Sequence, residues 1–144
     1  MSHLNKDASI SMNEIGVNAC TDITGFGLLG HLFEMCKASN VSSTISFNQL
    51  PLIQGVYELA QQNFIPGGTK KNLDFIESNI SFSNNISKEE KYIMADSQTS
   101  GGLLISTPKN KVEQLQKILN ENGCISNNIV GEINESNDFS IYVK

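Results

Sequence analysis

Residues 18–32 form the stretch that most limits how this chain can fold. They read Asn-Ala-Cys-Thr-Asp-Ile-Thr-Gly-Phe-Gly-Leu-Leu-Gly-His-Leu. The carboxylate of Asp22 is followed by glycines and then by apolar residues at helical spacing, which predicts a tight turn into a buried helix over residues 26–39. A carboxylate and flexible glycines at a helix start are also what a phosphate or metal-phosphate site needs. This stretch is therefore the first candidate for a functional site.

The same stretch matches the Gly-x-Gly-x-x-Gly pattern of dinucleotide-binding proteins, from Gly25 to Gly30. That pattern requires a buried strand before it and an acidic residue about 20 positions after it. No clean strand of Val and Ile precedes Gly25, and Leu50 and Pro51 stand where the acidic residue would be. We therefore exclude a dinucleotide-binding fold. Close packing of the helix at Gly27 and Gly30 is the simpler explanation for two of these glycines.

Composition limits the kind of protein. The chain has 144 residues, of which 39% are hydrophobic, so residues 1–144 can bury a core as one domain. The net charge is −5 and all ten basic residues are lysines, which argues against a nucleic-acid partner. No apolar run approaches the roughly 20 residues of a membrane span, and the first residues lack the apolar core of a signal peptide. We expect a soluble, cytoplasmic protein with no membrane partner.

The three cysteines, Cys20, Cys36 and Cys124, show neither paired spacing nor an even number. This argues against a disulfide framework or a zinc site, so we expect reduced thiols. Cys36 falls on the apolar face of the helix over residues 26–39 and should be a small core residue. Cys20 lies two positions from Asp22, whose charge would disfavour a thiolate, so we also expect a structural role for Cys20.

The rest of the chain alternates helical patterns with short strands. Residues 78–88 are rich in serine and asparagine, with only Ile80, Phe82 and Ile86 to anchor them, and we expect an exposed excursion there. The last two strands are separated by a polar turn and predict a terminal hairpin. Together the elements indicate an α+β sandwich. The remaining expected helices cover residues 4–15, 52–62 and 109–122, and the expected strands cover residues 43–47, 103–106, 129–133 and 139–143.

Asp22 is the candidate metal ligand, but an Asp before a helix can also simply stabilise the helix start. Magnesium commonly takes one or two carboxylates together with phosphates and waters, so a single Asp needs partners from elsewhere. Glycine loops beside hydroxyl groups can form anion-binding nests, although the same residues are ordinary in turns. The candidate phosphate-loop residues are Thr21, Thr24, Gly25, Gly27, Gly67, Gly68, Thr69, Gln98, Thr99, Ser100, Gly101 and Gly102. His31 has no catalytic partner at a defining spacing and is expected to be structural.

Three motifs, taken in order, resemble the C-terminal half of the selenophosphate synthetase (selenide, water dikinase) family. They run from Ala19 to His31, from Pro66 to Thr69 with Asn72, and from Asp96 to Leu104. The resemblance covers nearly the whole chain. It implies a PurM-like C-terminal domain, a three-layer α/β/α sandwich with a mixed, largely antiparallel sheet. It also implies an enzyme that makes selenophosphate, AMP and phosphate from ATP, selenide and water, in which Asp22 matches a magnesium-ligating aspartate.

Two departures from the family pattern stand out. Ser97 occupies a position where the family usually has proline. The chain also starts where the second domain of the family starts, without the N-terminal ATP-binding domain and its reactive cysteine or selenocysteine, which Cys20 does not match. We therefore expect this domain to act on ATP and selenide, with Mg²⁺, through the full-length enzyme and to be inactive alone. Binding of nucleotide by the isolated domain stays open. A homodimer stays open. The alternative is a non-catalytic phosphate-binding or structural module of the PurM-like superfamily.

Overall fold

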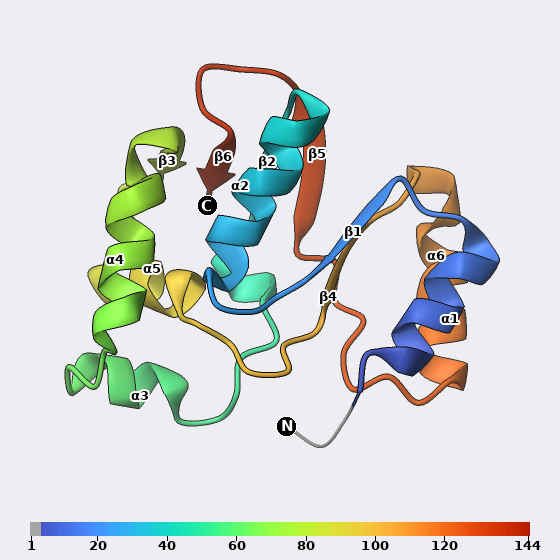
Figure 1. Cartoon of the computed structure of the whole chain (residues 1–144), viewed down its shortest axis with the longest axis horizontal. Coiled ribbons are helices and arrows are strands. Elements are labelled where there is room, and N and C mark those ends of the chain that lie inside the picture. The colour runs from blue at the N-terminus through green and yellow to red at the C-terminus, as the bar shows by residue number, and fades with distance from the viewer. Residues whose placement is uncertain (1–3) are drawn as a thin grey trace.

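The computed structural model describes residues 4–144, which form helices and short strands in alternation (Figure 1). Three single-turn 3₁₀ helices, at residues Phe47–Gln49, Glu77–Asn79 and Lys109–Lys111, join some of these elements. In chain order the elements are α1 (Lys6–Ile15), β1 (Ala19–Asp22), α2 (Gly27–Ser39), β2 (Val41–Ile45), α3 (Val56–Gln61), α4 (Gly67–Ile76), β3 (Ile80–Phe82), α5 (Lys88–Ala95), β4 (Leu103–Ser106), α6 (Val112–Glu121), β5 (Gly131–Glu135) and β6 (Ile141–Val143).

The strands form two groups. A four-stranded sheet has the order β3-β6-β2-β5, and a separate antiparallel ribbon pairs β1 with β4. Within the larger sheet, β2 runs antiparallel to β5 and parallel to β6, and β6 runs parallel to β3. The predicted α+β class with a mixed sheet is confirmed.

Successive residues of β4 face different helices, which gives this part of the domain its layers. Leu104 packs against the main core, which includes residues of α2, whereas Ile105 packs against a smaller core between α1 and α6. Neighbouring side chains of a strand point to opposite faces, so helices cover both sides of the β1–β4 ribbon. Figure 1 shows α1 and α6 side by side on the right of this ribbon, with α2 on its left.

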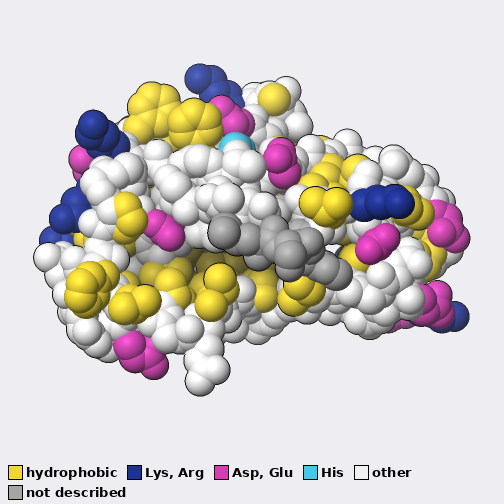
Figure 2. All heavy atoms as spheres, turned by 60° about the horizontal axis from the view of Figure 1, so that its bottom comes forward, with side chains coloured by type: hydrophobic (Ala, Val, Ile, Leu, Met, Phe, Trp, Pro, Cys, Tyr) yellow, Lys and Arg dark blue, Asp and Glu magenta, His cyan; other side chains and the backbone are white. Residues whose placement is uncertain are grey.

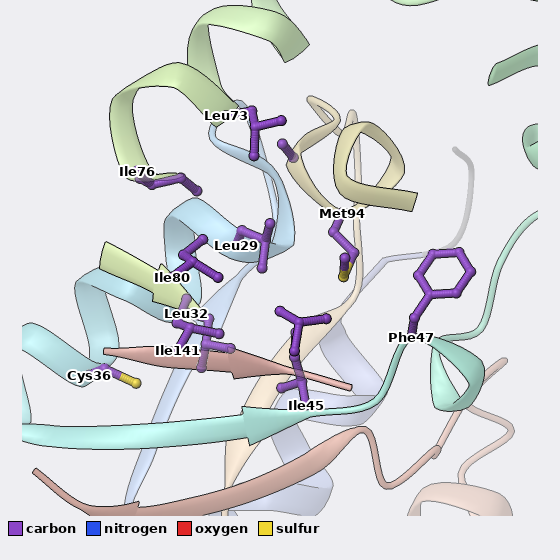
Figure 3. Close-up of a cluster of buried hydrophobic side chains, with 12 residues drawn as sticks. Leu29, Leu32, Cys36, Ile45, Phe47, Leu73, Ile76, Ile80, Met94 and Ile141 are labelled. Atoms are coloured by element: carbon purple, nitrogen blue, oxygen red, sulfur yellow. The ribbon is translucent and has the colours of Figure 1, made fainter. Parts of the chain in front are cut away.

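The main core is formed between α2, α4, α5 and the larger sheet. Leu29 and Leu32 of α2 point toward Ile45 of β2 and Ile141 of β6, with Met94 of α5 above them (Figure 3). Leu29 and Ile141 have no exposed surface, and Met94 has 1%. The apolar residues at helical spacing after the glycines at residues 25–30 bury one face of α2 on the sheet, as predicted from the sequence.

The predicted terminal hairpin is wrong. β5 and β6 do not pair with each other, because β2 lies between them. Ile141 and Val143 of β6 are buried, so this strand suits the interior of the sheet, whereas every residue of β5 is exposed, as an edge strand tolerates. The polar turn still orders the connection, since the backbone amide of Asn137 donates a hydrogen bond to the hydroxyl of Ser42 at 2.9 Å.

Residues 78–88, predicted to be an exposed excursion, contain β3, so that prediction is wrong. Ile80 is only 5% exposed and joins the main core, and β3 extends the sheet beside β6. Ser87 then starts α5 with a capping box, because its hydroxyl accepts from the amide of Glu90 while the Glu90 carboxylate accepts from the amide of Ser87. Ile80, Phe82 and Ile86 all pack against the main core, so three apolar residues in a polar stretch were enough to place a strand.

Hydrophobic side chains also gather on the surface around α3. Figure 2 shows a row of them at the lower left, over the region that α3 occupies in Figure 1. Helix α3 is shorter than the expected residues 52–62, and its neighbourhood accounts for several exposed apolar residues, namely Leu52, Ile53, Leu59 and Phe64.

Candidate functional site

The three sequence motifs meet at one place in the fold, and Asn72 is the residue that joins them. Its side-chain amide donates hydrogen bonds to the carbonyl of Gly25 at 2.9 Å and to the carbonyl of Ala95 at 3.0 Å. The hydroxyl of Ser97 donates to the same Gly25 carbonyl at 2.7 Å. Segments more than 20 residues apart in the chain are thus tied together by polar contacts.

Backbone contacts strengthen this junction. The amide of Gln98 donates to the carbonyl of Thr24 at 2.9 Å, and the amide of Ile23 donates to the carbonyl of Gly102 at 3.0 Å. Gly27 has a φ of 69° and lies against the backbone of Ala95, where a Cβ would come within 2.6 Å of the carbonyl carbon. Glycine at position 27 is therefore required both by backbone conformation and by space.

The expected glycine loop at Gly67-Gly68-Thr69 is in fact the start of α4, so that part of the prediction is wrong. Pro66 precedes the helix and glycines occupy its exposed first turn. Thr69 is 1% exposed, and its hydroxyl donates a hydrogen bond to the Asp96 carboxylate. This hydroxyl serves the junction between α4 and the loop after α5, while a phosphate role for the glycine amides stays a prediction.

The Asp96 carboxylate lies between two side-chain donors. Besides the hydroxyl of Thr69, the side-chain amide of Gln98 lies 3.3 Å from Asp96 Oδ2. A carboxylate held in this way orders the start of the loop over residues 96–102. Farther along, Thr99 and Ser100 are exposed, and their hydroxyls have no hydrogen-bond partner among residues 4–144. Ser100 adopts a φ of 56°, a conformation uncommon for a residue other than glycine.

His31 is a structural residue, as expected. Its ring is 8% exposed, and Nε2 lies 3.0 Å from the hydroxyl of Thr24. Nδ1 lies 3.5 Å from the carboxylate of Glu34, one turn later on α2. The Phe26 ring packs beside it at a centroid distance of 5.7 Å. The hydroxyl of Thr24 therefore has a hydrogen-bond partner within the fold, the ring of His31 on α2.

Asp22 ends β1 at the open end of the ribbon, opposite Leu103 of β4. The residue is exposed, and within the described part of the chain its carboxylate takes part in no hydrogen bond or ion pair. It borders an open groove of about 430 Å³ between α1 and the ribbon, which Lys6 and Ser9 line from the helix side. An unpaired, exposed carboxylate beside a groove is free to bind a cation.

Cys20 lies on the wall of the same groove, on the same face of β1 as Asp22. Burial raises the pKa of its thiol, and the charge of Asp22 raises that pKa further. The neutral thiol is therefore favoured, which agrees with the structural role expected for Cys20. All three cysteines are free, and Cys36 is fully buried in the main core.

The donor set fits a shared magnesium site. Among the residues that the structure describes, no group of three or more His, Cys, Asp or Glu side chains could hold a metal ion. Magnesium binds hard oxygen ligands and usually keeps several waters, so one carboxylate together with phosphate oxygens suits it. Asp22 can supply that carboxylate, whereas Asp96 is engaged by Thr69 and Gln98. Asp22 is therefore the candidate ligand that residues 4–144 offer beside this groove.

Sequence reasoning placed no candidate site residue on α1, although α1 contributes to the groove. Lys6 lines the groove, and the side-chain amide of Asn5 donates to the carbonyl of Gly101 at 2.9 Å, which ties the beginning of α1 to the third motif. The signal was weak, because an Asn-Lys pair before a helical pattern is common. Within residues 4–144, no helix is both long and apolar enough to cross a membrane.

Comparison with known proteins agrees with this arrangement. Residues 4–144 match the family model "AIR synthase related protein, C-terminal domain". The selenide, water dikinase of Caldanaerobacter subterraneus subsp. tengcongensis is 45% identical over 145 residues, which cover 100% of this chain and 42% of the relative. The enzyme of the same name from Clostridioides difficile is 45% identical over 133 residues, which cover 92% and 38%. "Selenide, water dikinase 2" of Peptoclostridium acidaminophilum is 39% identical over 143 residues, which cover 99% and 41%.

The chain thus spans about two fifths of the length of these relatives, with 42% the largest share among the three. The shared region includes all three motifs and the residues that join them. On the match of residues 4–144, the chain belongs to the AIR synthase related protein C-terminal domain family, and the relatives to which it is similar are named selenide, water dikinase.

Proposed function

We propose that this domain supplies Asp22 as a magnesium ligand at the ATP site of a selenide, water dikinase. The proposed reaction converts ATP, selenide and water into selenophosphate, AMP and phosphate. The single observation that carries the proposal is the position of the Asp22 carboxylate. It is exposed and unpaired within residues 4–144, and it ends the strand with which the first of the three joined motifs begins.

A magnesium ion bound to a triphosphate neutralises charge on the phosphate oxygens and favours attack at phosphorus. In this proposal Asp22 fixes where the metal-bound phosphates lie relative to the chain. Thr21 is next to it on β1, with its hydroxyl 3.3 Å from the carbonyl of Asp22. The exposed loop over residues 99–102 follows Gln98 and leads into β4, directly opposite β1. Its amides and hydroxyls are the proposed phosphate donors.

The proposed site is a shared one. One carboxylate leaves most of the magnesium coordination sphere to phosphates, waters and other ligands. We infer that these other ligands come from the region of the relatives that this chain does not match, which is more than half of their length. The domain by itself is then inactive, and it takes part in converting ATP and selenide only within the complete enzyme. We propose that the enzyme works in the cytoplasm, where ATP is available.

The test is a chimera that joins residues 1–144 to the unmatched N-terminal region of the Caldanaerobacter relative. Its product AMP is quantified by chromatography, and selenophosphate is identified by ³¹P NMR. We expect Asp22→Asn to lower turnover by about 100-fold or more, the scale of losing one charge-stabilising group in an active site. Asp138→Asn is the matched control, because Asp138 is an exposed carboxylate in the turn between β5 and β6.

Two outcomes would contradict the proposal. Turnover of the Asp22→Asn chimera equal to that of the parent would show that Asp22 is no ligand, and would favour a non-catalytic or structural module. Formation of AMP by residues 1–144 alone, in the presence of ATP and selenide, would show that no second region is needed. Circular dichroism of each variant separates loss of activity from loss of fold.

A further inference from the structure

We propose that Lys6 binds the phosphates of a metal-bound polyphosphate in the groove beside Asp22. This inference rests on the function proposed above for Asp22. The groove lies between the first turns of α1 and the open end of the β1–β4 ribbon. Lys6 is the one cationic side chain among the residues of the described chain that line it, and Asp22 is the one anionic side chain.

Strand geometry places Asp22 on the side of the ribbon that faces α1. Side chains two residues apart in a strand share a face, so Asp22 and Cys20 lie on the same side as their cross-strand partners Leu103 and Ile105. Ile105 packs into the small core with residues of α1 and α6. The carboxylate of Asp22 and the side chain of Lys6 thus border the same space from opposite walls.

The backbone at Lys6 is held in place through its neighbour, Asn5. The side-chain amide of Asn5 donates to the carbonyl of Gly101 at 2.9 Å, and the amide of Ile23 donates to the carbonyl of Gly102 at 3.0 Å. The first turn of α1, the end of β1 and the third motif therefore form one connected unit. Such a connection reduces the conformational freedom that Lys6 would lose on binding a ligand.

No hydrogen bond or ion pair with residues 4–144 gives Lys6 a role in stabilising the fold. Lys6 is exposed and forms no hydrogen bond or ion pair with residues 4–144. By contrast, Lys91 and Lys117 pair with carboxylates, and Lys111 donates to the carbonyls of Ile15 and Gly16. A cation in the first turn also opposes the helix dipole, so this position does not favour lysine for the stability of α1.

The charges of the groove select the class of ligand. A bare phosphate is attracted by Lys6 but repelled by Asp22, and a bare cation is attracted by Asp22 but repelled by Lys6, so each alone should bind only weakly. A polyphosphate that carries a divalent cation satisfies both, because the cation faces the carboxylate while phosphate oxygens face the ammonium group. Lysine is a normal phosphate-binding residue, acting as a point charge with three donors. With no arginine in the chain, this role falls to a lysine.

The experiment is a ¹⁵N NMR titration of the 144-residue chain with magnesium tripolyphosphate and, separately, with magnesium ATP. We expect both ligands to shift the resonances of residues 5–9, 20–22 and 101–103. Lys6→Gln should weaken both by about fivefold, the scale of one exposed charge contact, and Lys6→Arg should restore most of the affinity. Lys117→Gln is the matched control, since Lys117 is 75% exposed on α6 and lies outside the groove.

Equal affinity of the Lys6→Gln variant and the parent would overturn the inference, and so would an absence of shifts in the groove with either ligand. Binding of magnesium ATP without magnesium tripolyphosphate would also overturn it, because recognition would then rest on the nucleoside. Mn²⁺ added alone tests the role of Asp22 separately. If Mn²⁺ broadens the resonances of residues 21–22 and Asp22→Asn removes this broadening, Asp22 is supported as a metal ligand even where Lys6→Gln has no effect on polyphosphate binding. If Asp22→Asn leaves the broadening unchanged, the assignment of Asp22 is contradicted, while the affinity measured for Lys6→Gln remains valid.

Discussion

The α-carbon of Gly101 lies against the carbonyl oxygen of Ile23, so close that any side chain at position 101 would overlap it. This contact brings the loop of the third motif onto the end of the first motif. It lies next to the hydrogen bond between the Ile23 amide and the Gly102 carbonyl, which has a length of 3.0 Å. The approach of two backbones at this point sets the distance between the candidate phosphate loop and Asp22.

Gly101→Ala should therefore destabilise the domain by about 1 to 3 kcal/mol, because the new methyl group forces the two segments apart. Urea unfolding followed by circular dichroism measures this change. Gly102→Ala is the matched control. A Cβ at that position meets nothing within 4 Å, so its effect should stay within about 0.5 kcal/mol. Similar stability of the two variants would contradict the close approach.

The buried hydrogen bond from Thr69 to Asp96 gives a second prediction. Thr69→Val keeps the shape of the side chain but removes the donor, so the Asp96 carboxylate loses one of its two side-chain partners. We expect a loss of about 1 to 3 kcal/mol in the free energy of unfolding. Thr99→Val, at an exposed threonine of the same loop, should change stability by less than about 0.5 kcal/mol. If both variants were equally stable, the Thr69 hydroxyl would have no role in the junction.

Ile80 tests whether β3 is part of the core. Its side chain is 5% exposed and packs in the main core, so Ile80→Ala should cost about 2 to 5 kcal/mol through lost burial and the cavity left behind. Ile125 is 81% exposed, and Ile125→Ala should be nearly neutral. Thermal and urea unfolding of both variants provide the comparison. A small effect at Ile80 would indicate that residues 78–88 are the exposed excursion that their composition suggests.

The thiol of Cys20 gives a prediction with a defined pH dependence. Burial, and to a lesser extent the charge of Asp22, raises the pKa of Cys20, so at neutral pH it should react with iodoacetamide more slowly than an unfolded cysteine. Asp22→Asn removes the second cause and should shift the rate profile to lower pH. Mass spectrometry of the peptides follows each cysteine separately. Cys124, whose pKa is raised by burial and by Asp7, is the internal control and should keep its profile.

The same shift affects stability with a definite sign. Because the folded domain holds the Cys20 proton more tightly than the unfolded chain does, this contribution to stability is complete below the ordinary pKa of a thiol. It decreases as the pH rises from that value through the raised pKa. An increase in stability over this alkaline range in the parent, compared with Cys20→Ser, would contradict the direction of the shift.

Local sequence patterns predicted the helices in which regularly spaced apolar residues form the buried face. The apolar repeat after Gly27 predicted α2, and the repeat between Val112 and Glu121 predicted α6. The order of the three motifs pointed to the family that the comparisons confirm. These features depend on residues close together in the chain, where the period of a helix or the chemistry of a motif is visible directly.

The partners of strands and side chains could not be predicted in the same way. The polar turn before β6 looks like a hairpin, yet β2 lies between β5 and β6, because burial of Ile141 and Val143 against the helices favours the interior of the sheet. Thr69 looks like a loop hydroxyl, yet α4 directs it to Asp96. The free energy that decides such pairings comes from contacts between distant segments, which no local pattern contains.

The same distinction between local sequence and tertiary contacts applies to the candidate site. The sequence by itself determined helices such as α2 and α6, the three motifs, the family and the choice of Asp22 as the candidate metal ligand. Only the tertiary structure decided that Asn72 and Gly101 join the motifs, that Thr24 and Thr69 are engaged within the fold, and that Lys6 borders the groove beside Asp22. The physical reason is that residue type defines which chemistry is available, whereas packing of α1 against the β1–β4 ribbon determines which side chains share one space.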